Sequence, residues 1–189
     1  LLLAGSFGGG VHLATQWAGL RHTTATSATL FLSTSPVFIL LLAPSLLGER
    51  VRGRQWLGIA VSFAGIVAIV SQGDPRTIAS LSFNRGDLLA LGSMLMWALY
   101  TIMLKRRNDA LDMPQFLLVL TVVGALTLAP WVAWELAHDA HASLSRNGAL
   151  AILYSGIGSF LLAYHGWSYG VTRLGAARAG PWMQGVTAF

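Results

Sequence analysis

Few side chains in this 189-residue sequence have the types and spacing that acid–base, metal or nucleophilic chemistry requires. The absence of cysteine excludes a disulfide framework, a thiolate metal site and a cysteine nucleophile. All seven carboxylates fall in a loop or at the end of an apolar run, and no cluster of metal ligands or ordered Ser/His/Asp set accompanies them. The sequence therefore disfavours an enzyme and predicts no metal and no cofactor.

Two histidines, His12 and His165, lie within apolar runs, where polar side chains are costly and usually face a cavity or another helix. They are the titratable groups available if the molecule moves protons. The alternative is that each only hydrogen-bonds a neighbouring helix. His165 forms an i, i+4 pair with Tyr169, next to Tyr164.

His12 belongs to a stripe of small and polar residues. Gly5, Gly9, His12, Gln16 and Gly19 recur at spacings of four, three, four and three, which predicts one face of a helix. Small residues there permit close helix approach or leave room for a ligand, while His12 and Gln16 supply hydrogen-bonding groups. A tight helix–helix seam without a ligand explains the stripe equally well.

A second polar face precedes a proline. Thr26, Thr29 and Ser33 share one helical face, one turn before Pro36. Proline removes a backbone donor and disturbs the carbonyl about one turn earlier. The region is therefore either a hinge or ligand-facing kink, or a plain packing kink satisfied by Ser33 or Thr34.

Aromatic and amide residues complete the candidates. Trp97, Tyr100 and Thr101 in one apolar run, and Trp182 and Gln184 in the last, are suited to line an apolar cavity with polar fixing points, and lipid-facing or core positions are the alternative. The residues selected as candidates for lining a cavity are His12, Gln16, Thr26, Ser33, Pro36, Trp97, Tyr100, Tyr164, His165, Tyr169 and Gln184.

Seven apolar runs must position these residues. Hydrophobic residues make up 54% of the chain and charged residues 10%, and the mean hydropathy is +0.63, outside the balance of soluble domains. A bilayer-spanning helix needs about 20 mostly apolar residues, and continuous rather than alternating runs satisfy their backbone in lipid only as helices. The sequence thus predicts an all-α, polytopic transmembrane helix bundle. Its runs are 1–20, 26–47, 55–71, 87–104, 115–136, 148–170 and 175–189.

The net charge of +5 comes from basic residues in small loop groups, without the long basic face or aromatic platform of a nucleic-acid binder. Loops 48–54 and 105–114 and the 171–178 region hold eight Lys and Arg residues, against four in the opposite loops. The positive-inside rule predicts that the first set is cytoplasmic. At one of these helix ends, Glu49 and Arg50 are expected to anchor a loop that fixes the topology or gates the inner face.

An internal repeat is indicated when the chain is compared with itself at an offset of 151 residues, which gives six identities over 38 positions. Runs 1–20 and 148–170 pair under this offset and have four spans between them, so they point in opposite directions. An inverted-topology repeat of five helices follows. Both chain ends interrupt apolar sequence, and we expect two helices before Leu1 and one after Phe189. Under the same offset His12 matches Ala163, which disfavours a paired-histidine metal site.

An ordered series of motifs resembles the EamA family of the drug/metabolite transporter superfamily. The series is TATSATLFLSTSPVF from Thr24, LGER from Leu47, QWLGIA from Gln55, GDLLAL from Gly86 and WALY from Trp97. The resemblance covers essentially the whole chain, although Thr187 stands in the second half where the first has Pro36.

The resemblance implies that the chain comprises helices three to nine of a ten-helix, 5+5 inverted-repeat protein, with residues 1–73 in the first EamA repeat and 86–189 in the second. It also implies a secondary active transporter or exporter of small organic metabolites, such as amino acids, related compounds or drugs, working by alternating access across the inner cell membrane. A non-transporting membrane scaffold and a membrane-embedded enzyme are the alternatives. The expected partners are a small-molecule solute and the lipid bilayer, without nucleic acid, and a homodimer is left open.

Overall fold

The computed structural model describes residues 1–71, 73–74, 76, 79, 84–106, 111–139 and 145–182, and the regular structure in these ranges is helical. The first helix runs continuously through α1 (Leu2–Gly5), the π-helical segment η1 (Ser6–Val11) and α2 (His12–Leu20). The remaining elements are α3 (Ala25–Leu32), α4 (Ser35–Leu47), α5 (Gly53–Ser71), α7 (Arg85–Lys105), α8 (Met113–Asp139), α9 (Arg146–Tyr154), the π-helical η2 (Ser155–Ala163), α10 (Tyr164–Leu174) and α11 (Ala176–Ala179).

Four helices of the described ranges are long and apolar enough to cross a membrane. They are Ser27–Leu47, Arg85–Lys105, Met113–His138 and Arg146–Leu174. They coincide with four of the predicted runs and confirm the all-α transmembrane class. Runs 1–20 and 55–71 are helical as well, whereas the last predicted run, 175–189, falls outside the described residues beyond Trp182.

The helix ends follow from residues that the sequence supplies. At the start of α7, Asn84 Oδ1 accepts a hydrogen bond from the Asp87 amide at 3.0 Å, and Asp87 Oδ2 accepts one from the Asn84 amide at 2.9 Å. This capping box satisfies amides that the helix leaves unpaired. The other carboxylate oxygen of Asp87 accepts the hydroxyl of Thr23, which ties the preceding loop to α7. Gly48 (φ 66°) ends α4 and Gly175 (φ 92°) ends α10, in conformations that favour glycine.

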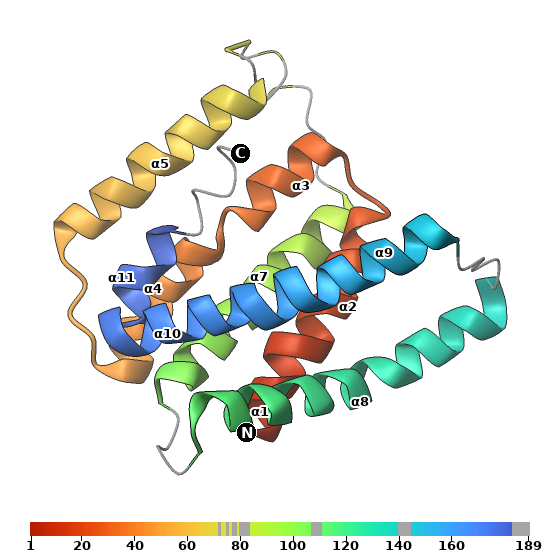
Figure 1. Ribbon diagram of the computed structural model, residues 1–189. Helices are drawn as coiled ribbons and strands as arrows, with labels where there is room; N and C mark the ends of the chain where they lie inside the picture. Colours follow the sequence, from red (N-terminus) through yellow and green to blue (C-terminus); the bar gives the residue numbers. More distant parts are fainter. Residues whose placement is uncertain are drawn as a thin grey trace.

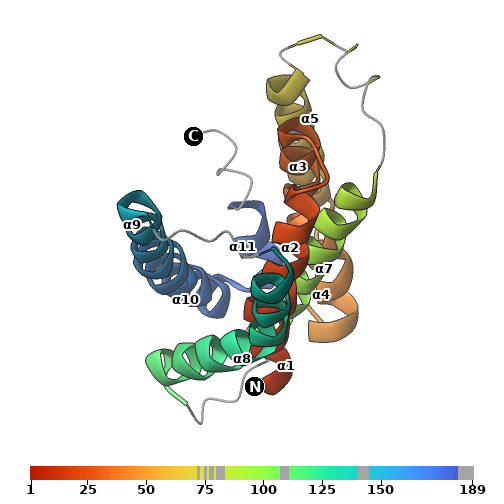
Figure 2. The ribbon, with the colours of Figure 1, turned by 90° about the vertical axis from the view of Figure 1, so that its right-hand side faces the viewer.

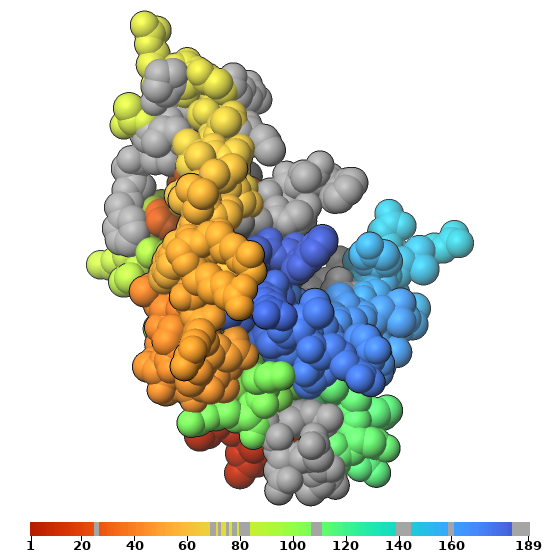
Figure 3. Space-filling view, turned by 90° about the vertical axis from the view of Figure 1, so that its left-hand side faces the viewer, coloured from red at the N-terminus to blue at the C-terminus, as the bar shows by residue number. Residues whose placement is uncertain are grey.

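The helix α7 lies at the centre of the bundle, between the first helix, the α3–α4 pair and α10 (Figures 1 and 2). Ala98, Tyr100 and Leu104 on this helix are completely buried. By contrast α5 packs mainly against α3 and α4, meets α11 near its start, through Gln55 and Ile59, and otherwise extends away from the bundle (Figures 1 and 3). The polar residues Asp87, Ser93 and Thr101 of α7 are accordingly enclosed by protein.

The first helix and α8 meet along a seam of glycines. A Cβ atom at Gly5 would lie 2.6 Å from Val123 Cβ, and one at Gly9 would lie 3.0 Å from Gly124 Cα. Close backbone approach at small residues is how many membrane helices associate. We call Gly5, Gly9, Val123 and Gly124 the glycine seam. At Gly5 and Gly9 the contacts therefore match the interpretation of a tight helix–helix seam, because α8 occupies the space beside both glycines.

Candidate functional site

The buried histidine His12 joins the first helix to α7. Its Nδ1 donates to the carbonyl oxygen of Ser93 at 3.0 Å. Its ring lies 5.2 Å from that of Trp97, centroid to centroid, with the planes tilted by 45°. His12 was expected either to face a cavity or to hydrogen-bond a neighbouring helix, and the structure shows the interhelical hydrogen bond. The imidazole also lies against the indole ring of Trp97.

Trp97 is the centre of a buried group of rings. Its centroid lies 5.3 Å from Tyr100 on the same helix, and 5.1 Å from Tyr164 and 5.8 Å from Trp167 on α10. The rings of Tyr100 and Tyr164 are 5.8 Å apart. These separations fall in the range of favourable aromatic pairs. We call His12, Trp97, Tyr100, Tyr164 and Trp167 the aromatic cluster.

The polar tips of the cluster bond across the helices. The Tyr164 hydroxyl donates to the Gly8 carbonyl oxygen at 2.5 Å. The Tyr100 hydroxyl shares a 3.2 Å hydrogen bond with Ser168 Oγ, and Trp167 Nε1 donates to Thr101 Oγ1 at 3.3 Å. Three helices are thus linked through side chains that are apolar on their faces and polar at their tips.

Two π-helical segments lie beside this network. Gly8, which accepts from Tyr164, is within η1, and Tyr164 itself follows directly after η2. Segments of π-helix are often found at functional sites, because the wider turn shifts the register of the residues that follow. At Gly8 the space is also restricted, since a Cβ would lie 2.6 Å from Tyr100 Cδ2.

Gln16 and Thr26 were also predicted to line a cavity. Gln16 is half-buried, one turn along the first helix from His12. The backbone of Thr26 lies in α3, and its side chain is outside the described set. Their part in a cavity stays a prediction.

The region before Pro36 is a break between two helices. α3 ends at Leu32, and α4 begins at Ser35 with Pro36 in its first turn. The hydroxyl of Ser33 donates to the Thr29 carbonyl at 2.7 Å, and that of Thr34 donates to Phe31 at 2.6 Å. Ser33 and Pro36 are both buried. These local bonds are the ones that the packing-kink interpretation requires, and a ligand-facing role for this region stays a prediction.

His165 and Tyr169 lie on a different face of α10 from the aromatic cluster. Both side chains are exposed, and the ring of Tyr169 lies under the Arg173 guanidinium at 5.4 Å. The structure therefore does not bring this pair together with His12. The remaining candidate, Gln184, lies outside the described residues.

The predicted candidates lacked several polar partners found in the cluster, namely Trp167, Ser168 and the carbonyls of Gly8 and Ser93. Spacing held a signal for the side chains. Trp97, Tyr100 and Thr101 follow the same i, i+3, i+4 pattern as Tyr164, Trp167 and Ser168. Such a pattern places three residues on one helical face, and in the structure the two faces meet. No group of three or more potential metal ligands is found within the ranges described.

These features define a polytopic helical membrane protein with a polar, aromatic centre enclosed by its helices. Its sequence matches the EamA-like transporter family over residues 1–71 and 84–187. The chain belongs to this family, which is one of transporters rather than enzymes.

Curated relatives are transporters as well. An uncharacterized transporter, YyaM of Bacillus subtilis (strain 168), is 29% identical over 168 residues, covering 86% of this chain and 53% of that protein. One from Archaeoglobus fulgidus is 29% identical over 159 residues, covering 84% of this chain and 54% of its own length. The thiamine-repressible mitochondrial transport protein THI74 of Saccharomyces cerevisiae is 38% identical over 106 residues, 53% of this chain and 29% of that protein. The chain spans about half the length of the first two, and no solved structure matches it.

Proposed function

We propose that the protein is a secondary active transporter of small organic metabolites and that the aromatic cluster lies on its solute path. The observation that supports this most is the position of the cluster. It joins the first helix to α7 and α10 through the bonds from His12 to Ser93 and from Tyr164 to Gly8. Ionisable and polar groups inside a membrane bundle are costly, and they mark solute or ion pathways by default.

The chemistry of the cluster suits an amphipathic solute. Aromatic faces bind apolar carbon skeletons, and a few convergent polar groups fix orientation. The imidazole of His12 and the hydroxyl of Tyr164 donate to backbone carbonyls, and the hydroxyl of Tyr100 is hydrogen-bonded to that of Ser168. A solute with donors and acceptors can replace those bonds without leaving a buried group unpaired, which otherwise costs about 1–3 kcal/mol.

The proposed movement is alternating access between the two repeats, residues 1–73 and 86–189. His12 and Gly8 belong to the first repeat, and Ser93 and Tyr164 to the second. Rocking of one half against the other around a midplane site is the common mechanism of inverted-repeat transporters. In this proposal, the two bonds open and close as the halves move.

The setting and direction are part of the same proposal. The eight basic residues of loops 48–54 and 105–114 and the 171–178 region support a cytoplasmic location for that side, and we propose a transporter or exporter of the inner cell membrane. The solute classes proposed are amino acids, related compounds and drugs. A homodimer stays a prediction, which mass measurement of the purified protein in detergent would test.

Solute flux tests the proposal. The protein is reconstituted in vesicles, and flux of amino acids, nucleosides and common drugs is measured. We expect His12→Ala to lower flux about five- to tenfold without loss of expression, as the removal of one buried hydrogen bond of about 1 kcal/mol predicts. His165→Ala is the matched control, since its side chain is exposed. Absence of flux in the wild type would favour the scaffold alternative, and equal flux in both variants would remove His12 from the path.

A further inference from the structure

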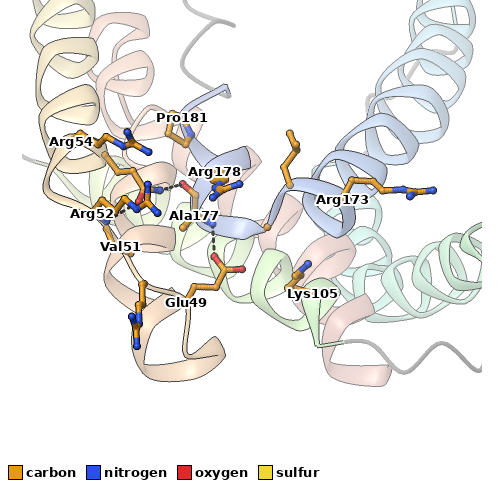
Figure 4. Close-up of a pocket in the computed structure, with 13 residues that line it drawn as sticks. Glu49, Val51, Arg52, Arg54, Lys105, Arg173, Ala177, Arg178 and Pro181 are labelled. Atoms are coloured by element: carbon orange, nitrogen blue, oxygen red, sulfur yellow. Dashed lines mark hydrogen bonds between the residues drawn. The ribbon is translucent and has the colours of Figure 1, made fainter.

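A hollow of about 910 Å³ opens where the basic loops converge (Figure 4). It lies between the start of α5, the end of α7 and the corner between α10 and α11. Its walls hold six cationic side chains: Arg50, Arg52, Arg54, Lys105, Arg173 and Arg178. The residues come from segments 50–54, 105 and 173–178, which are far apart in sequence, so the fold brings their positive charges together.

Side-chain bonds hold the walls of the hollow together. Glu49 lies after α4, and its two carboxylate oxygens accept the amides of Ala176 and Ala177 at 3.3 and 3.0 Å. Gln55 Nε2 on α5 donates to the Ala177 carbonyl at 3.1 Å. On the opposite wall, Lys105 Nζ donates to the Thr172 carbonyl at 3.0 Å. The cationic side chains are therefore carried by helix ends that hydrogen bonds hold in place.

The hollow has a strong excess of positive charge. Among the described residues that line it, Glu49 is the one acid, and its carboxylate is directed at the backbone of α11. Arg52, Arg54 and Arg178 all line the hollow, and Arg173 extends away from them in Figure 4. The start of α5 adds the positive end of its helix dipole, and no acidic residue in its first turn offsets that charge. Such a site favours an anion with several acceptor oxygens, and phosphate matches the guanidinium fork.

Apolar surface beside the hollow indicates a lipid rather than a soluble phosphate. Leu174, in the wall, is 52% exposed, and Trp56 and Leu57, just beyond Arg54 on α5, are 40% and 66% exposed. Tryptophan is enriched at the level of lipid headgroups. A molecule with its phosphate between the arginines could lay its acyl chains on these side chains.

We propose that this hollow binds the phosphate of an anionic phospholipid headgroup from the cytoplasmic leaflet. Arg52, Arg54 and Arg178 provide the charge, and Leu174, Trp56 and Leu57 contact the acyl chains. The site lies at the end of the bundle that is rich in basic residues, and it does not include the aromatic cluster. Solute selection and lipid binding are thereby separate properties.

Lipid retention tests this proposal directly. The purified protein is equilibrated with phosphatidylglycerol and phosphatidylcholine, and bound lipid is counted by native mass spectrometry. Each cation near an anionic membrane surface contributes about a factor of five. We therefore expect R52A/R54A/R178A to bind phosphatidylglycerol about 100-fold more weakly than the wild type. Replacement of the same three residues by lysine keeps the charge but not the guanidinium fork, so it should weaken binding less than alanine does.

Arg106→Ala is the matched control for the single variant Arg178→Ala, since Arg106 is an exposed member of the same basic set but does not line the hollow. Arg178→Ala should lower phosphatidylglycerol binding about fivefold, and Arg106→Ala should leave it unchanged. Equal loss in the two single variants would overturn the proposal in favour of diffuse surface charge. Displacement of the lipid by equimolar inorganic phosphate would overturn it in favour of a soluble ligand. An alanine variant that elutes as the wild type yet keeps its phosphatidylglycerol would also contradict it.

Discussion

The two faces of the first helix make opposite kinds of contact. Toward α8, the helix presents Gly5 and Gly9 to Val123 and Gly124, which leave no room for a Cβ. The hydroxyls of Ser6 and Thr127 also share a hydrogen bond there, at 3.2 Å. Toward α7 and α10, it presents His12 and the Gly8 carbonyl, each bonded to a partner on the other helix. One face is suited to a permanent contact, because its packing tolerates no added atom. The other is suited to exchange, because its hydrogen bonds can pass to a solute.

The largest effect is expected at the glycine seam. Gly9→Val would place atoms against Gly124 Cα, where even a Cβ lies at 3.0 Å and the neighbour is backbone. Overpacking of this kind costs about 1–3 kcal/mol or more. We expect a sharp fall in the yield of monodisperse protein and a lower temperature of unfolding.

Gly92→Val is the control for the seam, because an added Cβ at Gly92 in α7 has no neighbour within 4 Å. Both changes replace a helical glycine by valine, so intrinsic helix propensity contributes equally. If the two variants were equally stable, the seam would not be a tight contact.

A smaller effect is expected at the exchangeable face. Tyr164→Phe removes the hydroxyl that donates to Gly8 at 2.5 Å and keeps the ring. Interhelical hydrogen bonds in membranes contribute about 0.6 kcal/mol on average, so stability should change little. If the bond guides the movement of the halves, flux should fall by several fold. Tyr169→Phe, at a 56% exposed position, should leave flux unchanged, and the same loss in both variants would contradict the comparison.

The sequence was sufficient for the elements that depend on composition. The four membrane-length helices fall on predicted runs, because a bilayer demands long apolar helices whatever their neighbours are. The cap of α7 by Asn84 and Asp87 is likewise local.

The sequence did not predict that Gly5 and Gly9 would face α8 while His12 faces α7. The predicted stripe placed Gly5, Gly9 and His12 on one face, assuming a regular period. The π-helical segment Ser6–Val11 lies within that stretch and has a wider turn, so the glycines meet α8 while His12 meets α7. The exposed pair His165 and Tyr169 was equally hard to place. In a membrane protein the lipid face and the interior are both apolar, so hydrophobicity does not distinguish them.

Access to the aromatic cluster from the two sides of the membrane tests the central claim most directly. Ser168 is completely buried, and its hydroxyl is hydrogen-bonded to that of Tyr100. The chain has no native cysteine. In transporting vesicles, we expect the thiol of Ser168→Cys to react with a membrane-impermeant reagent supplied from either side, and transported solute to slow that reaction. Continued flux with a thiol that stays unreactive from both sides would contradict the account.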